Sequence, residues 1–188
     1  SSYALIREGK YLDKKYVQSA YALFDKYYPL EISPTLSSAQ KKKKMKEWWK
    51  AHYMLMIRSG MTRQILQKVA TKMTGRKGLS GFFRLLAKNK IPMLIFSSGQ
   101  GDVIKSYLQN KGFLTKNLHL LSNFYRFDKK GKAIGFKAEE MIHVFNKNEI
   151  EVKHHAYHQE VEGRKNVILL GDSLGDLGMI AGIHHHVV

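Results

Sequence analysis

The feature that most constrains the fold is an apolar segment near the end of the sequence that leads directly into an acidic, glycine-rich turn. Residues 166–170 read Asn-Val-Ile-Leu-Leu, and residues 171–176 read Gly-Asp-Ser-Leu-Gly-Asp. A short apolar run bounded by turn residues predicts a buried strand. Asp172 and Asp176 then lie at its carboxyl end, where α/β enzymes bind ligands and hard cations such as Mg²⁺. Asp172 could instead only cap the next helix, but the buried strand before it favours the metal.

A second predicted strand, residues 91–96, also ends in a turn suited to ligand binding. Ser97, Ser98, Gly99 and Gly101 follow it. Backbone amides and hydroxyls at a strand-to-helix turn can bind phosphate, although the same residues also occur in ordinary helix caps. The pattern G-x-x-x-x-G-K-[ST] is absent, so this is not a Walker-type P-loop. Two strand ends with complementary chemistry predict a phosphate-handling α/β site.

The order of predicted elements divides the chain into two modules. Apolar spacing predicts helices over residues 10–28, 37–59 and 62–71, with an extended link at residues 30–33, between two prolines, joining the first two. After a glycine-flanked basic stretch at residues 74–78, strands and helices alternate. Expected there are strands at 91–96, 118–122 and 167–170, a hairpin at 124–136, and helices at 79–90, 102–112, 149–161 and from 175 onward. We therefore expect an all-helical domain at 1–77 and an α/β domain at 78–188.

Composition excludes several classes of function. The 188 residues contain no cysteine, which rules out disulfides and thiolate metal sites. No apolar run approaches the roughly 20 residues of a membrane helix, and the first residues lack a signal-peptide pattern, so we expect no membrane partner and a cytoplasmic location. The net charge of +17 attracts polyanions. No RNA- or DNA-binding motif accompanies it, so nucleic acid is not the expected main partner.

Several further residues could carry chemistry. Lys137 follows the predicted hairpin, and an ammonium at the rim of a Mg²⁺-phosphate site would stabilise developing negative charge. With 32 basic residues in the chain, however, position alone does not single it out. Trp48 and Trp49 on a predicted helix could stack on a nucleobase, although such residues more often belong to the core. The histidines at 154–158 and 184–186 lack supporting ligands, so zinc is not expected.

With these residues in hand, the chain resembles the haloacid dehalogenase superfamily, and more closely its cytosolic 5'-nucleotidases that act on pyrimidine nucleotides. The segments that carry the resemblance are 26–31, 47–49, 95–103, 121–124, 135–137, 142–147 and 168–177. The resemblance implies a Rossmann-like parallel sheet core, incomplete here, with a helical cap domain.

The resemblance also implies an activity and its residues. Such enzymes hydrolyse a nucleoside 5'-monophosphate, here CMP or UMP, to nucleoside and phosphate through an aspartyl-phosphate, with Mg²⁺ as cofactor. Roles carried over by the motifs are phosphate binding, charge stabilisation, metal binding and nucleoside contact. The corresponding residues are Ser97 and Ser98 for phosphate, Lys137 for charge, Asp172 and Asp176 for metal, and Glu31 for the nucleoside.

Two departures from the family pattern stand out. The Asp-x-Asp-x-Thr motif that supplies the nucleophile is absent, so we expect an interior piece of the enzyme that is nearly inert by itself. A serine expected beside His52 is also missing, which leaves the base preference open. The alternatives are a non-catalytic nucleotide- or phosphate-binding relative, and a phosphatase of the same superfamily for a phosphorylated sugar, an amino acid or a methylated guanosine nucleotide.

Overall fold

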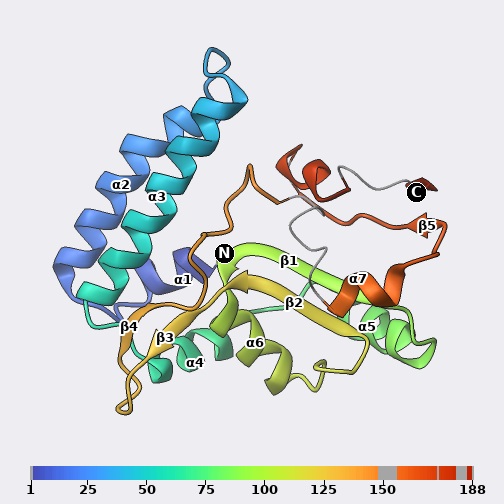
Figure 1. Ribbon diagram of the computed structural model, residues 1–188. Coiled ribbons are helices and arrows are strands. Elements are labelled where there is room, and N and C mark those ends of the chain that lie inside the picture. The colour runs from blue at the N-terminus through green and yellow to red at the C-terminus, as the bar shows by residue number, and fades with distance from the viewer. Residues whose placement is uncertain (1, 148–155, 173, 181–185, 188) are drawn as a thin grey trace.

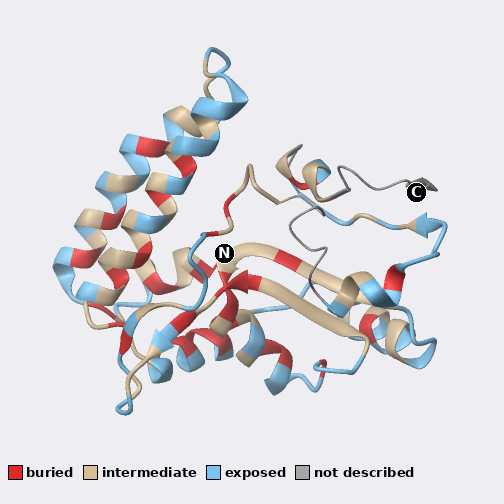
Figure 2. Ribbon diagram, viewed as in Figure 1, coloured by how far each residue is buried: buried red, intermediate tan, exposed pale blue. Residues whose placement is uncertain are grey.

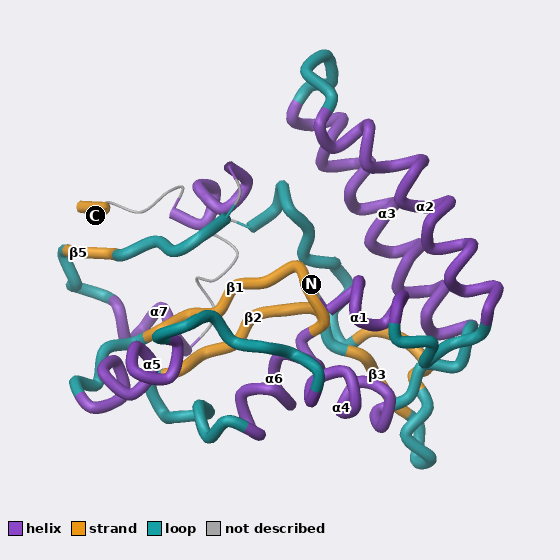
Figure 3. Tube along the Cα trace, turned by 180° about the vertical axis from the view of Figure 1, so that it is seen from behind, coloured by secondary structure: helices purple, strands orange, loops and turns teal. Residues whose placement is uncertain are grey.

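The computed structural model describes residues 2–147, 156–172, 174–180 and 186–187, and it shows an α/β fold from which a long helical hairpin projects (Figure 1). A short helix, α1 (Ser2–Glu8), precedes the hairpin helices α2 (Lys14–Ile32) and α3 (Ser38–Arg58). Seen from behind in Figure 3, the hairpin still stands clear of the strands. The fold class predicted from the sequence is thus confirmed.

Local capping sets where the hairpin helices begin. The Asp13 carboxylate accepts a hydrogen bond from the Tyr16 amide at 2.6 Å and starts α2. Ser37 and Gln40 form a reciprocal capping box, in which the Gln40 amide donates to Ser37 Oγ at 3.2 Å and the Ser37 amide donates to Gln40 Oε1 at 2.8 Å. Both bonds satisfy amides that have no partner inside the helix. The predicted start of the second long helix is therefore confirmed.

The predicted end of the first helix is wrong, because α2 continues through Pro29 to Ile32. Proline removes one amide donor from a helix, and the carbonyl left over is that of the exposed Asp25, which water can satisfy. Leu30, one residue beyond the proline, packs against the buried cluster of Tyr27, Met45 and Trp48. This packing holds the last turn in helical form where an extended link was expected.

The α/β part is built on a parallel pair of strands. After α4 (Arg63–Thr71) and α5 (Leu79–Lys88), β1 (Met93–Gln100) leads into α6 (Gly101–Asn110), and β2 (Leu118–Asn123) returns parallel to β1. The register pairs Met93 with Leu118 and Ser97 with Ser122, and it shifts before Gln100 pairs with Asn123.

Two details of this unit differ from expectation. Strand β1 runs on past residue 96 and includes the stretch expected as a loop, and Gln100, not Asp102, is the N-cap of α6. The Asp102 carboxylate instead accepts a hydrogen bond from the Tyr125 amide at 2.9 Å. Asp102 lies inside α6, so it cannot be the N-cap, and its carboxylate fixes the neighbouring chain segment instead.

The remaining strands form two small pairs. The predicted hairpin is confirmed, with β3 (Tyr125–Phe127) antiparallel to β4 (Ala133–Phe136). Near the carboxyl end, α7 (Ala156–Val161) is followed by β5 (Asn166–Val167), the 3₁₀ helix η2 (Leu174–Ile180) and β6 (His186–Val187), which pairs parallel with β5. Residues 149–155 of the expected helix lie outside the described residues.

The buried strand expected at 167–170 is wrong. Only Asn166 and Val167 are in strand conformation, and Ile168 and Leu170 are 71% and 64% exposed. Figure 2 shows this segment as largely exposed. A strand is buried by its neighbours, and among the described residues β5 pairs with β6 alone. The final helix expected from residue 175 is a 3₁₀ helix from Leu174.

One hydrophobic cluster spans the expected domain boundary at 77/78. It includes Tyr53 and Met56 from α3 together with Val103 and Tyr107 from α6 and Tyr125 from β3. The division into 1–77 and 78–188 stays a prediction, and the core is continuous across it. None of the described helices combines the length and the apolar character that crossing a membrane requires.

We predict that Met45→Ala destabilises the protein by about 2–5 kcal/mol, because Met45 is fully buried between the hairpin helices and truncation leaves a cavity. Urea unfolding followed by circular dichroism measures the change. Lys43→Ala, two residues away on an exposed position of the same helix, is the control and should change the stability by less than about 0.5 kcal/mol. Equal midpoints for the two variants would contradict the packing described.

Candidate active site

Three segments form the candidate site: the carboxyl end of β1, the segment at residues 141–147, and the turn at residues 171–176. Ser97 is half-buried at the end of β1, and its Oγ accepts a hydrogen bond from the Gly99 amide at 3.1 Å. The turn into α6 is tight, because a Cβ on Gly101 would lie 2.7 Å from the Phe124 ring. The sequence predicts a phosphate-binding turn at Ser97 and Ser98, whereas both lie within β1 near its end, and phosphate binding there stays a prediction.

Side chains from other elements hold the backbone at this strand end. The Ser98 carbonyl oxygen accepts from Tyr3 Oη at 2.9 Å, Trp49 Nε1 at 2.8 Å and Asn123 Nδ2 at 3.1 Å. The next carbonyl, of Gly99, accepts from Tyr53 Oη at 2.9 Å and from Ser122 Oγ at 3.0 Å. These bonds fix the peptide planes that follow Ser97.

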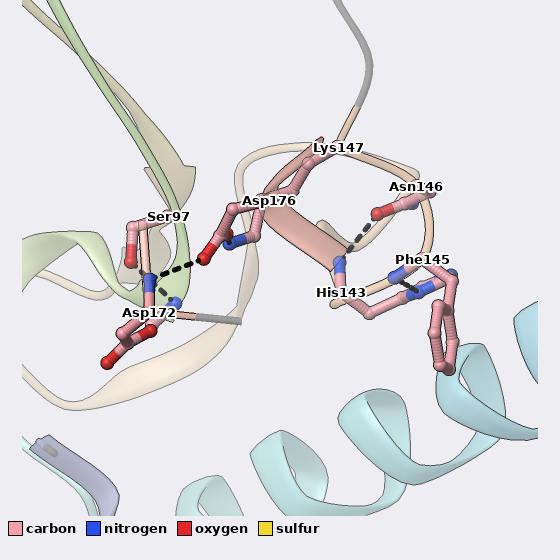
Figure 4. A network of polar contacts seen from close by, with 8 residues as sticks. Ser97, His143, Phe145, Asn146, Lys147, Asp172 and Asp176 are labelled. Carbon is pink, nitrogen blue, oxygen red and sulfur yellow. Dashed lines mark hydrogen bonds and ion pairs between the residues drawn. The ribbon is translucent and has the colours of Figure 1, made fainter. Parts of the chain in front are cut away.

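A buried ion pair is the centre of the acidic turn (Figure 4). Lys147 Nζ lies 2.6 Å from Asp176 Oδ1, and the two side chains are 11% and 10% exposed. The Asp172 amide donates to Asp176 Oδ2 at 3.2 Å, so the Asp176 carboxylate holds both the lysine and the turn. Asp172 itself is exposed on this turn.

The lysine that the structure brings to the carboxylates is Lys147, not Lys137. Lys137 is exposed at the end of β4, and its ammonium lies 5.6 Å from the centre of the Phe124 ring. Sequence reasoning missed Lys147 although its segment, residues 142–147, was among those that carry the family resemblance. Both lysines end a segment that carries the resemblance, residues 135–137 and residues 142–147, so position in the sequence did not separate them.

The segment that carries Lys147 is anchored at both of its sides. The Asn123 side chain donates to the Ile142 carbonyl and accepts from the Ile142 amide, both at 2.8 Å. Asn146 Oδ1 accepts from the His143 amide at 2.6 Å. On the other side, Phe145 packs against the cluster on the α2–α3 hairpin. The lysine is thereby placed by the strands and by the hairpin together.

Of the two aspartates, one could coordinate a magnesium ion directly. Mg²⁺ is commonly bound through one or two carboxylates, water and substrate phosphates. Asp172 has an exposed carboxylate that could coordinate the ion, while Asp176 is occupied by Lys147 and would orient the turn. Within the described residues no group of three or more acidic, histidine or cysteine side chains converges on one point. The donor set therefore fits a cation that also binds phosphate and water.

Glu31 lies apart from this group, on the last turn of α2. It is half-buried, and burial raises the pKa of its carboxyl above the usual value. The positive charge of Lys41 offsets only part of this increase. In the described part of the chain, no hydrogen bond or ion pair joins Glu31 to Asp172, Asp176 or Lys147. The Lys41 ammonium also lies 5.7 Å from the centre of the Phe145 ring. Glu31 therefore lies at the end of the hairpin on which the segment that carries Lys147 packs.

A cavity of about 220 Å³ opens between α1, α2 and α3. Its walls are mainly aromatic, and Arg7 adds a positive charge. The aromatic and imidazole rings that line it are those of Tyr3, Phe24, Trp48, Trp49 and His52. Burial, with a smaller effect of Arg7, lowers the pKa of His52 to about 4, so this histidine is neutral at pH 7. Tyr3 and Trp49 also bond to the Ser98 carbonyl, so the cavity adjoins the end of β1.

We predict that His143 makes the protein less stable as the pH falls from 6.5 to about 4. Burial lowers the pKa of His143 from 6.5 to about 4, and its Nδ1 accepts a hydrogen bond from the Phe145 amide, which requires the neutral ring. The unfolded chain gains this proton first, so acid favours unfolding. Urea midpoints measured above pH 6.5 and between pH 6.5 and about 4 test this. In His143→Gln the midpoint should depend less on pH. An unchanged slope in that variant would contradict it.

Comparison with known proteins places the chain in a family. A profile of the family described as "Pyrimidine 5'-nucleotidase (UMPH-1)" matches residues 1–188. The chain is 38% identical over 185 residues to the human 7-methylguanosine phosphate-specific 5'-nucleotidase, covering 97% of this chain and 61% of the relative. It is 35% identical over 165 residues to a putative cytosolic 5'-nucleotidase 3 of Caenorhabditis elegans, covering 86% of this chain and 44% of that protein.

A solved structure supports the same assignment. The crystal structure of cytosolic 5'-nucleotidase IIIB bound to cytidine superposes with a TM-score of 0.77 at 31% identity, over 100% of this chain and 64% of that one. The chain thus spans about three fifths of the length of the human relative and of the solved structure, and less than half of the Caenorhabditis elegans protein. It belongs to the pyrimidine 5'-nucleotidase (UMPH-1) family.

Proposed function

We propose that this protein is a Mg²⁺-dependent, cytoplasmic 5'-nucleotidase that releases phosphate from a nucleoside 5'-monophosphate. The observation that carries the proposal is the buried Lys147–Asp176 pair, whose carboxylate also binds the amide of the exposed Asp172. The Ser97 hydroxyl near the end of β1 is the third component. A fixed ammonium, a hydroxyl and an open carboxylate are complementary to a phosphate with its divalent cation. The names of the relatives, all 5'-nucleotidases, support the same reaction.

The residues divide the work of binding and charge stabilisation. Ser97 Oγ and the Ser98 amide bind phosphoryl oxygens, and Lys147 neutralises the negative charge that builds up during transfer. Asp176 holds that lysine in place through the 2.6 Å contact. Asp172 would coordinate the ion, which when bound polarises the phosphoryl group. The sequence contains no Asp-x-Asp pair, so the roles of these side chains are binding and positioning.

The cavity between α1, α2 and α3 is the proposed site for the nucleoside. Its aromatic side chains offer faces on which a base can stack, and Tyr3 and Trp49 connect it directly to the phosphate end. Arg7 repels a positively charged base such as 7-methylguanine, which favours a neutral pyrimidine. The names of the relatives favour 7-methylguanosine phosphate instead, whereas the structural neighbour binds cytidine.

Phosphate release tests the function directly. The protein expressed from its complete coding sequence is assayed with Mg²⁺ on CMP, UMP, 7-methylguanosine 5'-monophosphate, a phosphorylated sugar and a phosphorylated amino acid, and again after chelation of the metal. Turnover that is lost with the metal supports the proposal. Binding of nucleotide without turnover would support a non-catalytic relative, and turnover restricted to phosphorylated sugars or amino acids would support a phosphatase with another substrate.

We predict that Lys147→Met lowers kcat by about 100-fold or more, because it removes the ammonium beside the Asp172–Asp176 turn. The matched control is Lys137→Met, which removes an exposed ammonium and should leave kcat within about twofold. Thermal unfolding of both variants shows whether the fold is retained. A large loss in Lys137→Met with little effect of Lys147→Met would restore the role that the sequence assigned to Lys137.

Arg7→Met should shift the substrate preference. Removing this cation from the cavity is expected to raise the ratio of kcat/KM for 7-methylguanosine 5'-monophosphate to kcat/KM for CMP by about three- to tenfold. The reason is that the repulsion between Arg7 and the positively charged base, which solvent partly screens, is lost. Steady-state rates on both substrates measure the ratio. If the ratio stays the same, the base does not bind in this cavity.

A further inference from the structure

The Ser98 carbonyl is unusual because side chains from three different elements donate to it. Tyr3 on α1, Trp49 on α3 and Asn123 on β2 all lie 2.8–3.1 Å from this oxygen. A carbonyl oxygen has two lone pairs, so three donors saturate it. The peptide that joins Ser98 to Gly99 is therefore fixed in orientation and strongly polarised.

The other end of the same peptide points at Ser97. Its N–H, from Gly99, donates to Ser97 Oγ at 3.1 Å. Polarising the carbonyl makes this N–H a better donor, because hydrogen bonds in a chain strengthen one another. Since Ser97 Oγ accepts from Gly99, its own O–H is left to donate elsewhere. The three donors thus influence the direction and acidity of the Ser97 hydroxyl.

These donors also connect the strand end to both neighbouring parts of the site. Tyr3 and Trp49 line the cavity between α1, α2 and α3. Asn123, which is 4% exposed, bonds at the same time to both backbone groups of Ile142, in the segment that carries Lys147. One carbonyl therefore receives contacts from the cavity wall and from the anchor of the lysine segment.

We propose that Tyr3, Trp49 and Asn123 are positioning residues that act through the Ser98 carbonyl to aim the Ser97 hydroxyl at a phosphoryl oxygen. This inference rests on the proposed function, which it deepens by linking the nucleoside cavity to phosphate binding. A base that packs against Tyr3 and Trp49 restrains their donors and so stabilises the phosphate-binding geometry. A base that fits the cavity then also improves the binding of the phosphate group.

The carbonyl can be observed directly in the 188-residue chain. Serine–glycine pairs occur three times, at Ser59–Gly60, Ser80–Gly81 and Ser98–Gly99. Labelling serine with ¹³C at the carbonyl and glycine with ¹⁵N leaves three signals in a carbonyl–amide correlation spectrum. We expect Tyr3→Phe and Trp49→Phe each to move the Ser98–Gly99 signal upfield in ¹³C, while the other two signals stay in place as internal references.

Matched variants separate the loss of a donor from the loss of packing. Trp48→Phe removes the same atoms from the wall of the same cavity, but the Trp48 ring stacks on Tyr27, with 5.9 Å between the ring centres, instead of bonding to Ser98. Tyr125→Phe removes a buried hydroxyl that contacts Met56 Sδ at 3.4 Å. Neither control should move the Ser98–Gly99 signal. Equal shifts in the controls and the test variants, or no shift in Tyr3→Phe and Trp49→Phe, would overturn the inference.

The functional arm compares a nucleotide with p-nitrophenyl phosphate, a phosphate ester without a nucleobase. Tyr3→Phe in the full-length protein should lower kcat/KM by about fivefold on both, since one hydrogen bond acting on the phosphate is lost. A loss on the nucleotide alone would mean that Tyr3 only contacts the base, and would overturn the positioning role.

Failure of the proposed function gives a different pattern. If the wild-type protein hydrolyses neither ester, the proposed function is wrong, and inorganic phosphate then serves as the probe. Movement of the Gly99 amide signal on adding phosphate, with weaker binding in Tyr3→Phe, would still support the positioning role. No movement in the wild type would overturn it.

Discussion

The structure depends on how the backbone at the carboxyl end of β1 is held by the helices around it. Strand pairing with β2 leaves the carbonyls of Ser98 and Gly99 directed at the helical layer, where aromatic side chains supply the donors. Buried carbonyls without partners would cost free energy, so the aromatic residues cannot be replaced freely. The same contacts join the helices to the strands into one hydrophobic core.

The Lys147–Asp176 pair places a further constraint on the site. Burying two charges is expensive unless further hydrogen bonds compensate, and here the Asp172 amide supplies one to Asp176. Such a pair contributes little net stability, but removing one partner leaves the other charge buried. Its value is therefore geometric, because it connects the segment at residues 141–147 to the acidic turn. In a protein with a net charge of +17, a lysine fixed on a carboxylate in this way differs from the many exposed ones.

How much the sequence predicted depends on whether the signal was local. The capping box at Ser37 and Gln40 and the hairpin of β3 and β4 are set by neighbouring residues, and both were predicted correctly. The end of α2 was not, because packing of Leu30 overrides the proline before it. Strand burial at 167–170 was predicted from composition, whereas burial depends on neighbours that the pattern does not contain. The same holds for Lys147 and Lys137, since only the tertiary contacts of residues 141–147 distinguish the two lysines.

The anchoring of residues 141–147 has a mechanical consequence for the helical hairpin. Phe145 packs on α2 and α3, and Lys147, only two residues further on, is bound to Asp176. Two residues of extended chain span at most about 7 Å, so the segment is a short connection between the hairpin and the acidic turn. A large rotation of the hairpin away from β1 must either pull the lysine from its carboxylate or separate Phe145 from the helices. A movement that carries the hairpin away from β1 therefore also acts on the Lys147–Asp176 contact, and the packing that holds the hairpin in place helps to hold this charge in place.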